Sequence, residues 1–457
     1  MSTPTAETVF TFALRAGDLM VRNGSPSANV TSVLLAITRA MGYPGATATV
    51  TMGELGLSLT RPDSVPITQV HSVGAATFNL EAVTQTEQVV KAVIMRDLPI
   101  EDGLASLEAI GSTRLGHTPP IELAGWGLMS AGFAWLLGGH LTACVLASIT
   151  SVVIELLAAR LARAELPGFF SHVLAGAAAV AAAVVTQLLS PGQMPGLVIT
   201  AALVSRLAGA ATFGAAQDLL TGWYITAAGR ILELALNTAG QVVGVILMAN
   251  LANRLDVGLN IERLPDGSPG LVHATTAAVV ISVGFCIASQ LRWRRIPAVI
   301  VLTSIVYPIY QGAQIADFSR LVAAAAAATT LGAITVLVAP FTRIPSAGAL
   351  GVVLAPLLPG MLVYIGFVSI ALDRDGASDS FLQAAGVALS TGAGAVLGQY
   401  LAAQILAHLR TPEIRGRRLA GPDVDDAVMT ARWLSAPTFR RPYVTDALVT
   451  ETAAEET

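Results

Sequence analysis

Long apolar segments recur along the chain from residue 122 onward, and they restrict its fold more than any other feature of the sequence. A helix needs about 20 consecutive apolar residues to cross the hydrocarbon core of a bilayer. Segments of roughly this length occupy residues 122–140, 142–160, 169–190, 195–214, 223–252, 271–291, 296–316, 319–339, 346–371 and 381–408. We therefore predict a polytopic α-helical membrane protein with about ten transmembrane helices.

The low content of charged residues supports this class of protein. Only 12% of the residues are charged and 54% are hydrophobic, whereas soluble proteins carry about 25% charged residues. The net charge of −4 argues against a nucleic-acid partner, which would favour a basic surface. Cys144 and Cys286 lie inside apolar segments, as small buried hydrophobes do, and no Cys/His ligand spacing is present. We therefore expect neither a metal nor another cofactor.

Residues 1–120 are the longest stretch with soluble character and predict a small α+β domain. A helical stripe of apolar residues ends near Met20, and residues 23–26 break it. We expect a second helix at residues 27–41, three strands at 46–52, 55–60 and 67–73, and two further helices at 80–96 and 99–110. The first helix lacks the continuous apolar core of a secretory signal, so this domain is expected to stay in the cytoplasm.

Arginine residues are concentrated on alternate connections between the predicted helices. The positive connections and the segment after the last helix hold Arg160, Arg163, Arg292, Arg294, Arg295, Arg343, Arg410, Arg415, Arg417 and Arg418. The opposite connections, which include residues 254–266, 317–320 and 373–379, are balanced or acidic. The positive-inside rule then predicts that both termini lie in the cytoplasm. The tail at residues 411–457 is expected to be disordered.

The membrane part divides into a first half at residues 121–255 and a second half at residues 256–410, which resemble each other weakly. The first contains Leu207-Ala208-Gly209 and, later, Leu236-Asn237-Thr238 with Gly240; the second contains Leu354-Ala355-Pro356 and Leu389-Ser390-Thr391 with Gly392. Because five helices per half is an odd number, a duplicated half would be inverted in the membrane. Inverted repeats are typical of secondary transporters.

The order of these features, from about residue 8 to residue 410, resembles the threonine/serine exporter family. The similarity is carried by residues 16–20, 24–28, 78–80, 206–209, 218–222 and 356–360. The resemblance implies a cytoplasmic α+β domain joined to five plus five transmembrane helices in the cell (plasma or inner) membrane. It also implies export of threonine and serine driven by the proton-motive force, with a small amino acid, protons and the lipid bilayer as partners. A homo-oligomer is compatible with it.

Ionisable side chains inside a membrane span are costly and therefore predict function. Glu155 is a candidate for proton coupling, although a carboxylate near the interface could equally pair with Arg160 or Arg163. Asp218 is a second proton-coupling candidate. Arg206 could pair with Asp218 or gate the cytoplasmic mouth, and Asp317 is the other gating candidate.

A polar stripe in the segment at residues 223–252 is predicted to bind the substrate. Arg230, Glu233, Asn237 and Gln241 are spaced three and four residues apart and share one helical face. A zwitterionic amino acid needs a cation, an anion and hydrogen-bonding groups, and this stripe supplies all three. The alternative is an Arg230–Glu233 pair within the helix, with the amides binding neighbouring helices.

The prolines of residues 356–360 predict a broken helix in the second half. The N-terminus of a half-helix can bind a carboxylate, so Pro359 and Gly360 are further substrate-binding candidates. The alternative is a kink without a ligand.

A hydrolase and a channel or scaffold are the alternatives to an exporter. A membrane-anchored hydrolase would need a site in the N-terminal domain, for which Ser25 or Ser27 with His71 and Asp63 are the available residues, but no recognisable motif marks them. A channel or scaffold would not need the ionisable residues in the spans. His140 and His172 are interpreted as structural. We therefore expect a transporter and not an enzyme.

Overall fold

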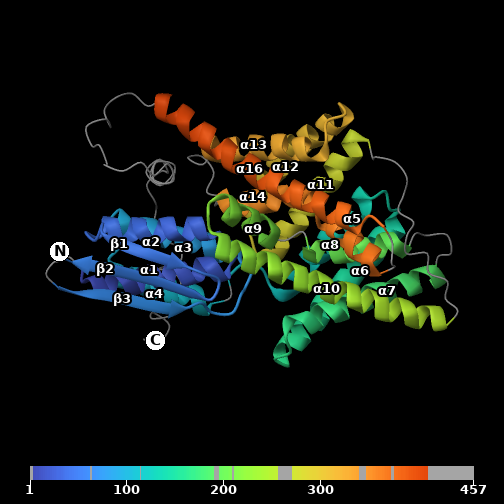
Figure 1. Cartoon of the computed structure of the whole chain (residues 1–457), viewed down its shortest axis with the longest axis horizontal. Helices are drawn as coiled ribbons and strands as arrows, with labels where there is room; N and C mark the ends of the chain where they lie inside the picture. Colours follow the sequence, from blue (N-terminus) through green and yellow to red (C-terminus); the bar gives the residue numbers. More distant parts are fainter. Residues whose placement is uncertain are drawn as a thin grey trace, which may run out of the picture.

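The computed structural model describes residues 4–61, 64–113, 115–189, 195–207, 210–255, 270–338, 346–371 and 375–409. Figure 1 shows an α+β domain at one end of the molecule and a bundle of helices at the other. The tail at residues 411–457, Arg343 and most of the charged connection at residues 254–266 lie outside the described residues.

The N-terminal domain contains a three-stranded antiparallel sheet in the order β1-β2-β3. Its elements are α1 (Ala6–Arg22), α2 (Ser27–Ala40), β1 (Ala46–Val50), β2 (Glu54–Arg61), β3 (Ser64–Ser72), α3 (Leu80–Ile94) and α4 (Ile100–Ser112). The three strands and four helices expected from the sequence are confirmed to within a few residues. Leu55, Leu57 and Leu59 alternate along β2 and are buried against the apolar face of α1, so one face of the sheet supports the helices.

The remaining described residues form helices. They are α5 (Pro119–Leu136), α6 (Leu141–Arg163), α7 (Gly168–Leu189), α8 (Pro195–Leu207), α9 (Ala210–Leu220), α10 (Tyr224–Arg254), α11 (Leu271–Ala288), the 3-10 turn η1 (Trp293–Arg295), α12 (Ile296–Ile315), α13 (Arg320–Val338), α14 (Ser346–Leu354), the 3-10 turn η2 (Ala355–Leu357), α15 (Gly360–Ala371) and α16 (Ala377–Leu409).

Seven helices in the described part of the chain are long and apolar enough to cross a membrane. They are α6, α7, α10, α11, α12 with η1, α13 and α16. The break predicted at residues 356–360 is confirmed, because α14 ends at Leu354 and α15 begins at Gly360. The span predicted at residues 195–214 covers α8 (Pro195–Leu207) and the beginning of α9 (Ala210–Leu220); residues 208 and 209, between them, lie outside the described residues.

Large apolar side chains are exposed along α6 at a helical spacing. They are Leu141, Val145, Ile149, Val153 and Leu156. Residues three and four apart share one face of a helix, so these side chains form a continuous apolar stripe. Soluble proteins rarely expose such a surface, whereas a membrane helix presents it to lipid. The protein is thus a multi-pass membrane protein.

Glycines allow the backbones of three helix pairs to approach closely. In the α7–α10 pair, Gly176 lies against the backbone of Gln241 and Gly244 lies against Val173. A Cβ atom at either glycine would collide with the facing carbonyl oxygen. Small residues at a crossing are the usual way in which membrane helices pack.

The α13–α16 pair repeats the same arrangement. Gly332 lies against the backbone of Ala395, and Gly398 lies against Thr329. Both pairs share one register: on each helix, the residue that the partner's glycine contacts lies three positions before the helix's own glycine. The α5–α11 pair is reciprocal within itself, because Gly125 and Gly284 each lie against the other's helix.

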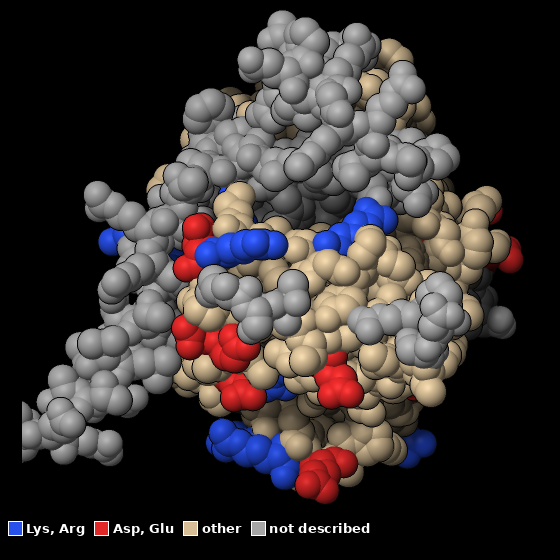
Figure 2. Space-filling view, turned by 90° about the vertical axis from the view of Figure 1, so that its left-hand side faces the viewer, with Lys and Arg blue, Asp and Glu red and all other residues tan. Residues whose placement is uncertain are grey.

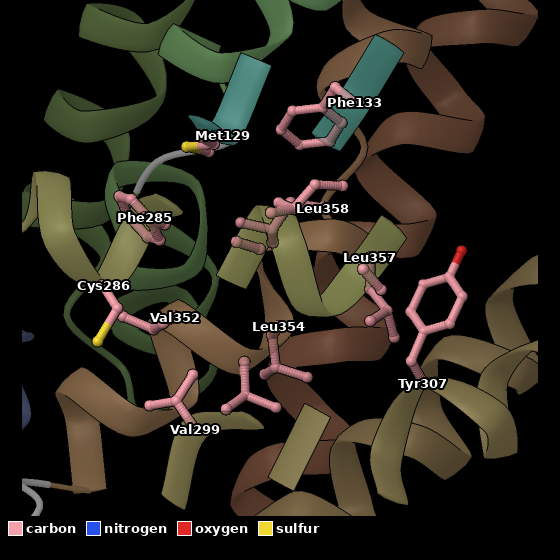
Figure 3. Packing of buried hydrophobic residues seen from close by; sticks show 14 of the residues in the cluster. Met129, Phe133, Phe285, Cys286, Val299, Tyr307, Val352, Leu354, Leu357 and Leu358 are labelled. Atoms are coloured by element: carbon pink, nitrogen blue, oxygen red, sulfur yellow. The ribbon is translucent and has the colours of Figure 1, made fainter. Parts of the chain in front are cut away.

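The largest buried apolar cluster surrounds the broken helix of the second half. Figure 3 shows side chains from α5, α11, α12 and α14 meeting there, with Leu357 of η2 directed toward Tyr307 of α12. Leu358, in the break itself, belongs to the same cluster. The break is therefore enclosed by helices from both halves of the membrane part.

Candidate functional site

An ion pair between two helices of the bundle is the centre of the candidate site. Arg206, near the end of α8, donates a hydrogen bond from Nη1 to Oε1 of Glu155 on α6 at 2.6 Å. The two side chains are 14% and 19% exposed, so both charges are largely withdrawn from the surroundings. Glu155 therefore pairs with Arg206, and not with Arg160 or Arg163, the partners of the alternative interpretation.

Two further polar side chains lie beside this pair. Nε2 of Gln241 on α10 is 3.3 Å from Nδ1 of His172 on α7. His172 is close enough to Arg206 for an electrostatic interaction. We call Glu155, His172, Arg206 and Gln241 the polar cluster. It joins α6, α7, α8 and α10. It brings together one residue of the predicted stripe, Gln241, one of the two proton-coupling candidates, Glu155, and one of the two gating candidates, Arg206.

The polar cluster retains unused hydrogen-bonding capacity. Oε1 of Gln241 and Nε of Arg206 are buried and have no hydrogen-bond partner. The hydroxyl group of Tyr364, on α15, is also buried without a partner. Buried polar groups are nearly always paired in native proteins, so unpaired atoms in one region indicate a place for a ligand or water.

Tyr364 brings the second half of the membrane part into the same region. It packs in one apolar cluster with Ile154 of α6, Leu203 of α8 and Val245 of α10. Ile154 is adjacent to Glu155, and Leu203 and Val245 are one helical turn from Arg206 and Gln241. The tyrosine therefore approaches the polar cluster from the broken-helix side.

Arg230 does not join the other residues of the predicted stripe. Its Nε is 3.2 Å from Oδ2 of Asp218 on α9, and its Nη2 donates a hydrogen bond to the carbonyl oxygen of Ser25 at 2.9 Å. Asp218 accepts hydrogen bonds from the backbone N–H of Ser27 at 2.7 Å and from its hydroxyl group at 3.3 Å. We call Ser25, Ser27, Asp218 and Arg230 the docking interface.

Asp218 supplies the helix cap that the sequence of α2 lacks. The residue before α2 is Pro26, whose side chain cannot accept a hydrogen bond, so the first N–H groups of the helix need an external acceptor. Asp218 is fully buried in this position.

A second contact joins the N-terminal domain to the connection between α11 and α12. Glu81 of α3 lies 3.4 Å from Nη1 of Arg295 and 3.5 Å from Nε of Arg292. Arg295 also donates a hydrogen bond to the hydroxyl group of Thr84 at 2.7 Å. The N-terminal domain is therefore fixed to the bundle at two places.

The other predicted site residues lie apart from the polar cluster. Glu233 is exposed on α10, and no ion pair among the described residues joins it to Arg230. Asn237 is half-buried, and Asp317 is exposed just after α12, with a left-handed φ of 61°.

Pro359 and Gly360 are buried at the break, as expected for a half-helix terminus. The stripe at residues 230–241 is thus divided between two different environments, because successive turns of α10 face different neighbours.

Sequence reasoning missed His172 and Tyr364. His172 was interpreted as structural because it stands alone among apolar residues, although it precedes the close-approach glycine Gly176 by one helical turn. The spacing of four residues between His172 and Gly176 places the histidine on the face of α7 that packs against α10. No pattern in the sequence marks Tyr364, because its position beside the polar cluster depends on which helices surround α15.

The residues of the alternative hydrolase do not come together. His71 lies 3.8 Å from Asp18, and the hydroxyl group of Ser27 faces Asp218. Asp63 lies outside the described residues. The part of the chain that the structure describes also contains no group of three His, Cys, Asp or Glu side chains that could hold a metal ion.

Comparison with known proteins adds independent information. A sequence profile described as "Putative threonine/serine exporter" matches residues 11–252. A protein of Mycobacterium tuberculosis named "Probable threonine/serine exporter" is 27% identical over 87% of this chain and 77% of its own length. The "Threonine/serine exporter" of Corynebacterium glutamicum is 25% identical over 87% of this chain and 83% of its own length. No solved structure matches.

Proposed function

Because the chain belongs to the threonine/serine exporter family, we propose that it is a secondary active exporter of small hydroxylated amino acids, with threonine and serine as substrates. The observation that carries this proposal is the largely buried Glu155–Arg206 pair, together with the unpaired Oε1 of Gln241, whose Nε2 contacts His172. Burying two charges inside a membrane bundle costs desolvation free energy. An ion pair that is retained there therefore indicates a functional role.

The polar cluster matches the chemistry of a zwitterionic amino acid. Arg206 is suited to the substrate carboxylate, because a guanidinium group binds a carboxylate through two parallel hydrogen bonds. Glu155 is suited to the substrate ammonium group. Gln241 and His172 offer a donor and an acceptor for the hydroxyl group that distinguishes serine and threonine from alanine and valine. The hydroxyl group of Tyr364 would complete this site from the second half.

Proton coupling follows from competition at one carboxylate. Ionised Glu155 binds the substrate ammonium group, whereas protonated Glu155 does not. A proton and the substrate therefore exclude each other at this residue, and each weakens the binding of the other by the same factor. A site that carries either one across the membrane, but not both, exchanges protons for amino acid. Asp218 has no such role in this mechanism, because it caps α2 in the docking interface.

We propose that residues 121–255 and 256–410 are two inverted halves. The supporting observation is the matched glycine register of the α7–α10 and α13–α16 pairs. In this register Gly240 corresponds to Gly394, and not to the Gly392 that the local sequence similarity suggested. With α5, α8 together with α9, and α14 together with α15 as further crossings, each half spans the membrane five times.

The orientation proposed is one with the N-terminal domain, residues 1–120, in the cytoplasm. This domain contacts the connection that holds Arg292 and Arg295 and the connection that follows Asp218. Both connections belong to the side that the positive-inside rule places in the cytoplasm. The contacts and the charge distribution therefore support the same orientation.

Transport of labelled threonine and serine into or out of sealed proteoliposomes tests the function. We expect uphill movement when a pH gradient is imposed and its collapse when an uncoupler is added. If the uncoupler leaves the movement unchanged, proton coupling is rejected but the exporter function is not. The absence of any threonine or serine movement by folded protein would reject the proposed function.

A further inference from the structure

A pocket in the N-terminal domain lies outside both the polar cluster and the docking interface. It is formed between α1, β3 and α4, and its volume is about 430 Å³. Sites for small molecules usually occupy roughly 300–1,000 Å³. The pocket is therefore large enough to be a specific site for a small ligand and a few water molecules.

Both signs of charge line this pocket. Arg15 of α1 and Glu108 of α4 lie on its wall, together with Gln69 and His71 of β3. Glu108 is exposed, and the side chain of Arg15 is 30% exposed. Figure 2 shows acidic and basic side chains interspersed on the end of the molecule that the N-terminal domain forms. A pocket that offers one cation and one anion suits a ligand that carries both.

The guanidinium group of Arg15 is held in place but is not fully used. Its Nη1 donates a hydrogen bond to Asp18 at 3.3 Å, whereas its Nε is buried without a hydrogen-bond partner. Gly111 of α4 lies against Nη2 of Arg15, and a Cβ atom at this position would be only 2.9 Å from that nitrogen. The absence of a side chain at Gly111 therefore leaves room for the guanidinium group at the edge of the pocket.

Asp18 does not compete for a ligand, because its carboxylate is already bound within the domain. Its Oδ1 accepts a hydrogen bond from the backbone N–H of Gly74 at 2.9 Å, and its Oδ2 faces Arg15 and lies 3.8 Å from His71. Glu108 is thus the carboxylate of the pocket wall that remains available to a positively charged group. The hydrogen bonds between Gln69 and its neighbours, Thr11 and Glu7, are 3.5 Å long and weak enough to be exchanged for a ligand.

From this arrangement we infer that the pocket is a second binding site, in the N-terminal domain, for a small zwitterionic amino acid. Arg15 binds the carboxylate, Glu108 binds the ammonium group, and Gln69 with Thr11 accommodates a polar side chain. The pocket lies on α1, and the chain that leaves α1 forms the docking interface through Ser25 and Ser27. A ligand here is thus positioned to report the concentration of amino acid to the transport helices. The choice of serine and threonine as ligands rests on the proposed function.

Binding of labelled serine and threonine to the purified full-length protein, carrying Arg206→Gln to disable the polar cluster, tests the inference. We expect saturable binding of about one ligand per chain that weakens about tenfold in Arg15→Gln and in Glu108→Gln, since each loses a charge-assisted hydrogen bond. Glu101→Gln is the matched control, because Glu101 is an exposed glutamate of the same helix outside the pocket. Its affinity should remain unchanged.

Two analogues of serine test the requirement for both charges. Ethanolamine lacks the carboxylate and 3-hydroxypropionate lacks the amino group, so each should compete poorly with labelled serine. Absence of binding by Arg206→Gln protein that gel filtration shows to be folded, equal loss in Glu101→Gln and Glu108→Gln, or full competition by either analogue would overturn the inference. Transport by the unmodified protein is measured separately, so failure of this site is distinguishable from failure of the exporter.

Discussion

At the scale of single residues, the Glu155–Arg206 pair has a clear energetic constraint. Each charge makes the other tolerable between membrane helices, so removal of one leaves the other buried without a counter-ion. Loss of one partner from a buried pair costs about 3–5 kcal/mol, whereas loss of an exposed charge costs little. The exposed Glu233 on α10 therefore offers a comparison within the same membrane part.

We expect Glu155→Gln to reduce export driven by a pH gradient by at least about tenfold, because glutamine neither takes up a proton nor neutralises Arg206. Glu233→Gln, which changes an exposed carboxylate, should retain most of the activity. The measurement is uphill efflux of labelled threonine from proteoliposomes, with the amount of folded protein checked by gel filtration. Equal activity of the two variants would exclude Glu155 from the coupling step.

At the scale of helices, close backbone approach sets the geometry of the bundle. Gly398 of α16 lies against the backbone of α13, whereas Gly312 of α12 has no atom within 4 Å of the position that a Cβ would occupy. The same chemical change at these two sites therefore has opposite expected effects on stability.

Gly398→Ala should destabilise the protein by about 1–3 kcal/mol, because α13 and α16 must separate to admit the methyl group. Gly312→Ala should be neutral or stabilising by up to about 1 kcal/mol, because alanine has the higher helix propensity. Thermal unfolding in detergent measures both. If α7–α10 repeats α13–α16, Gly244→Ala should match Gly398→Ala; similar midpoints for all three variants would contradict the tight crossings.

Elements with a local pattern could be predicted from the sequence, whereas contacts between elements could not. The strands β1 to β3 show alternation and Thr/Val enrichment, and the break before Gly360 is marked by two prolines. By contrast, Glu155 and Arg206 are 51 positions apart and lie on different helices. No periodicity within either helix indicates their pairing. The spacing of Arg230 and Gln241 did predict a shared face, but α10 is long enough for that face to meet two neighbours.

At the scale of the whole molecule, the proposed orientation of the N-terminal domain predicts the side of the membrane on which each connection lies. Arg163, the last residue of the long helix α6, and Asp317, after α12, are both exposed and adjoin connections that are predicted to lie on opposite sides of the membrane. The chain has only two cysteines, Cys144 and Cys286, so a cysteine-free background requires two substitutions to alanine.

In that background, a cysteine introduced by Arg163→Cys should react with a membrane-impermeant maleimide only from the cytoplasmic side. A cysteine introduced by Asp317→Cys should react in intact cells. Labelling is measured by a mass shift of the purified protein, with transport confirming that the background folds. Reaction of both positions from one side would contradict the proposed topology.

The docking interface makes a separate prediction about the N-terminal domain. Asp218→Ala removes the acceptor for the first turn of α2 and leaves Arg230 without its carboxylate, so amide exchange of residues 27–30 should become faster. Loss of a helix cap alone costs about 1 kcal/mol, which corresponds to about a fivefold acceleration. Hydrogen exchange followed by mass spectrometry measures it, with the peptides of β2 as the internal control. Unchanged protection of residues 27–30 would contradict the capping role.

The cap of α2 also has a consequence for the order in which the protein matures. Ser27 leaves the ribosome long before Asp218, which follows it by 191 positions. Until the later segment has been synthesised and inserted, the amides at the start of α2 can bond only to water. The N-terminal domain therefore completes its structure only after several membrane helices are in place, and newly made chains stalled before residue 218 should present an open, solvated helix end to the chaperones of the cell.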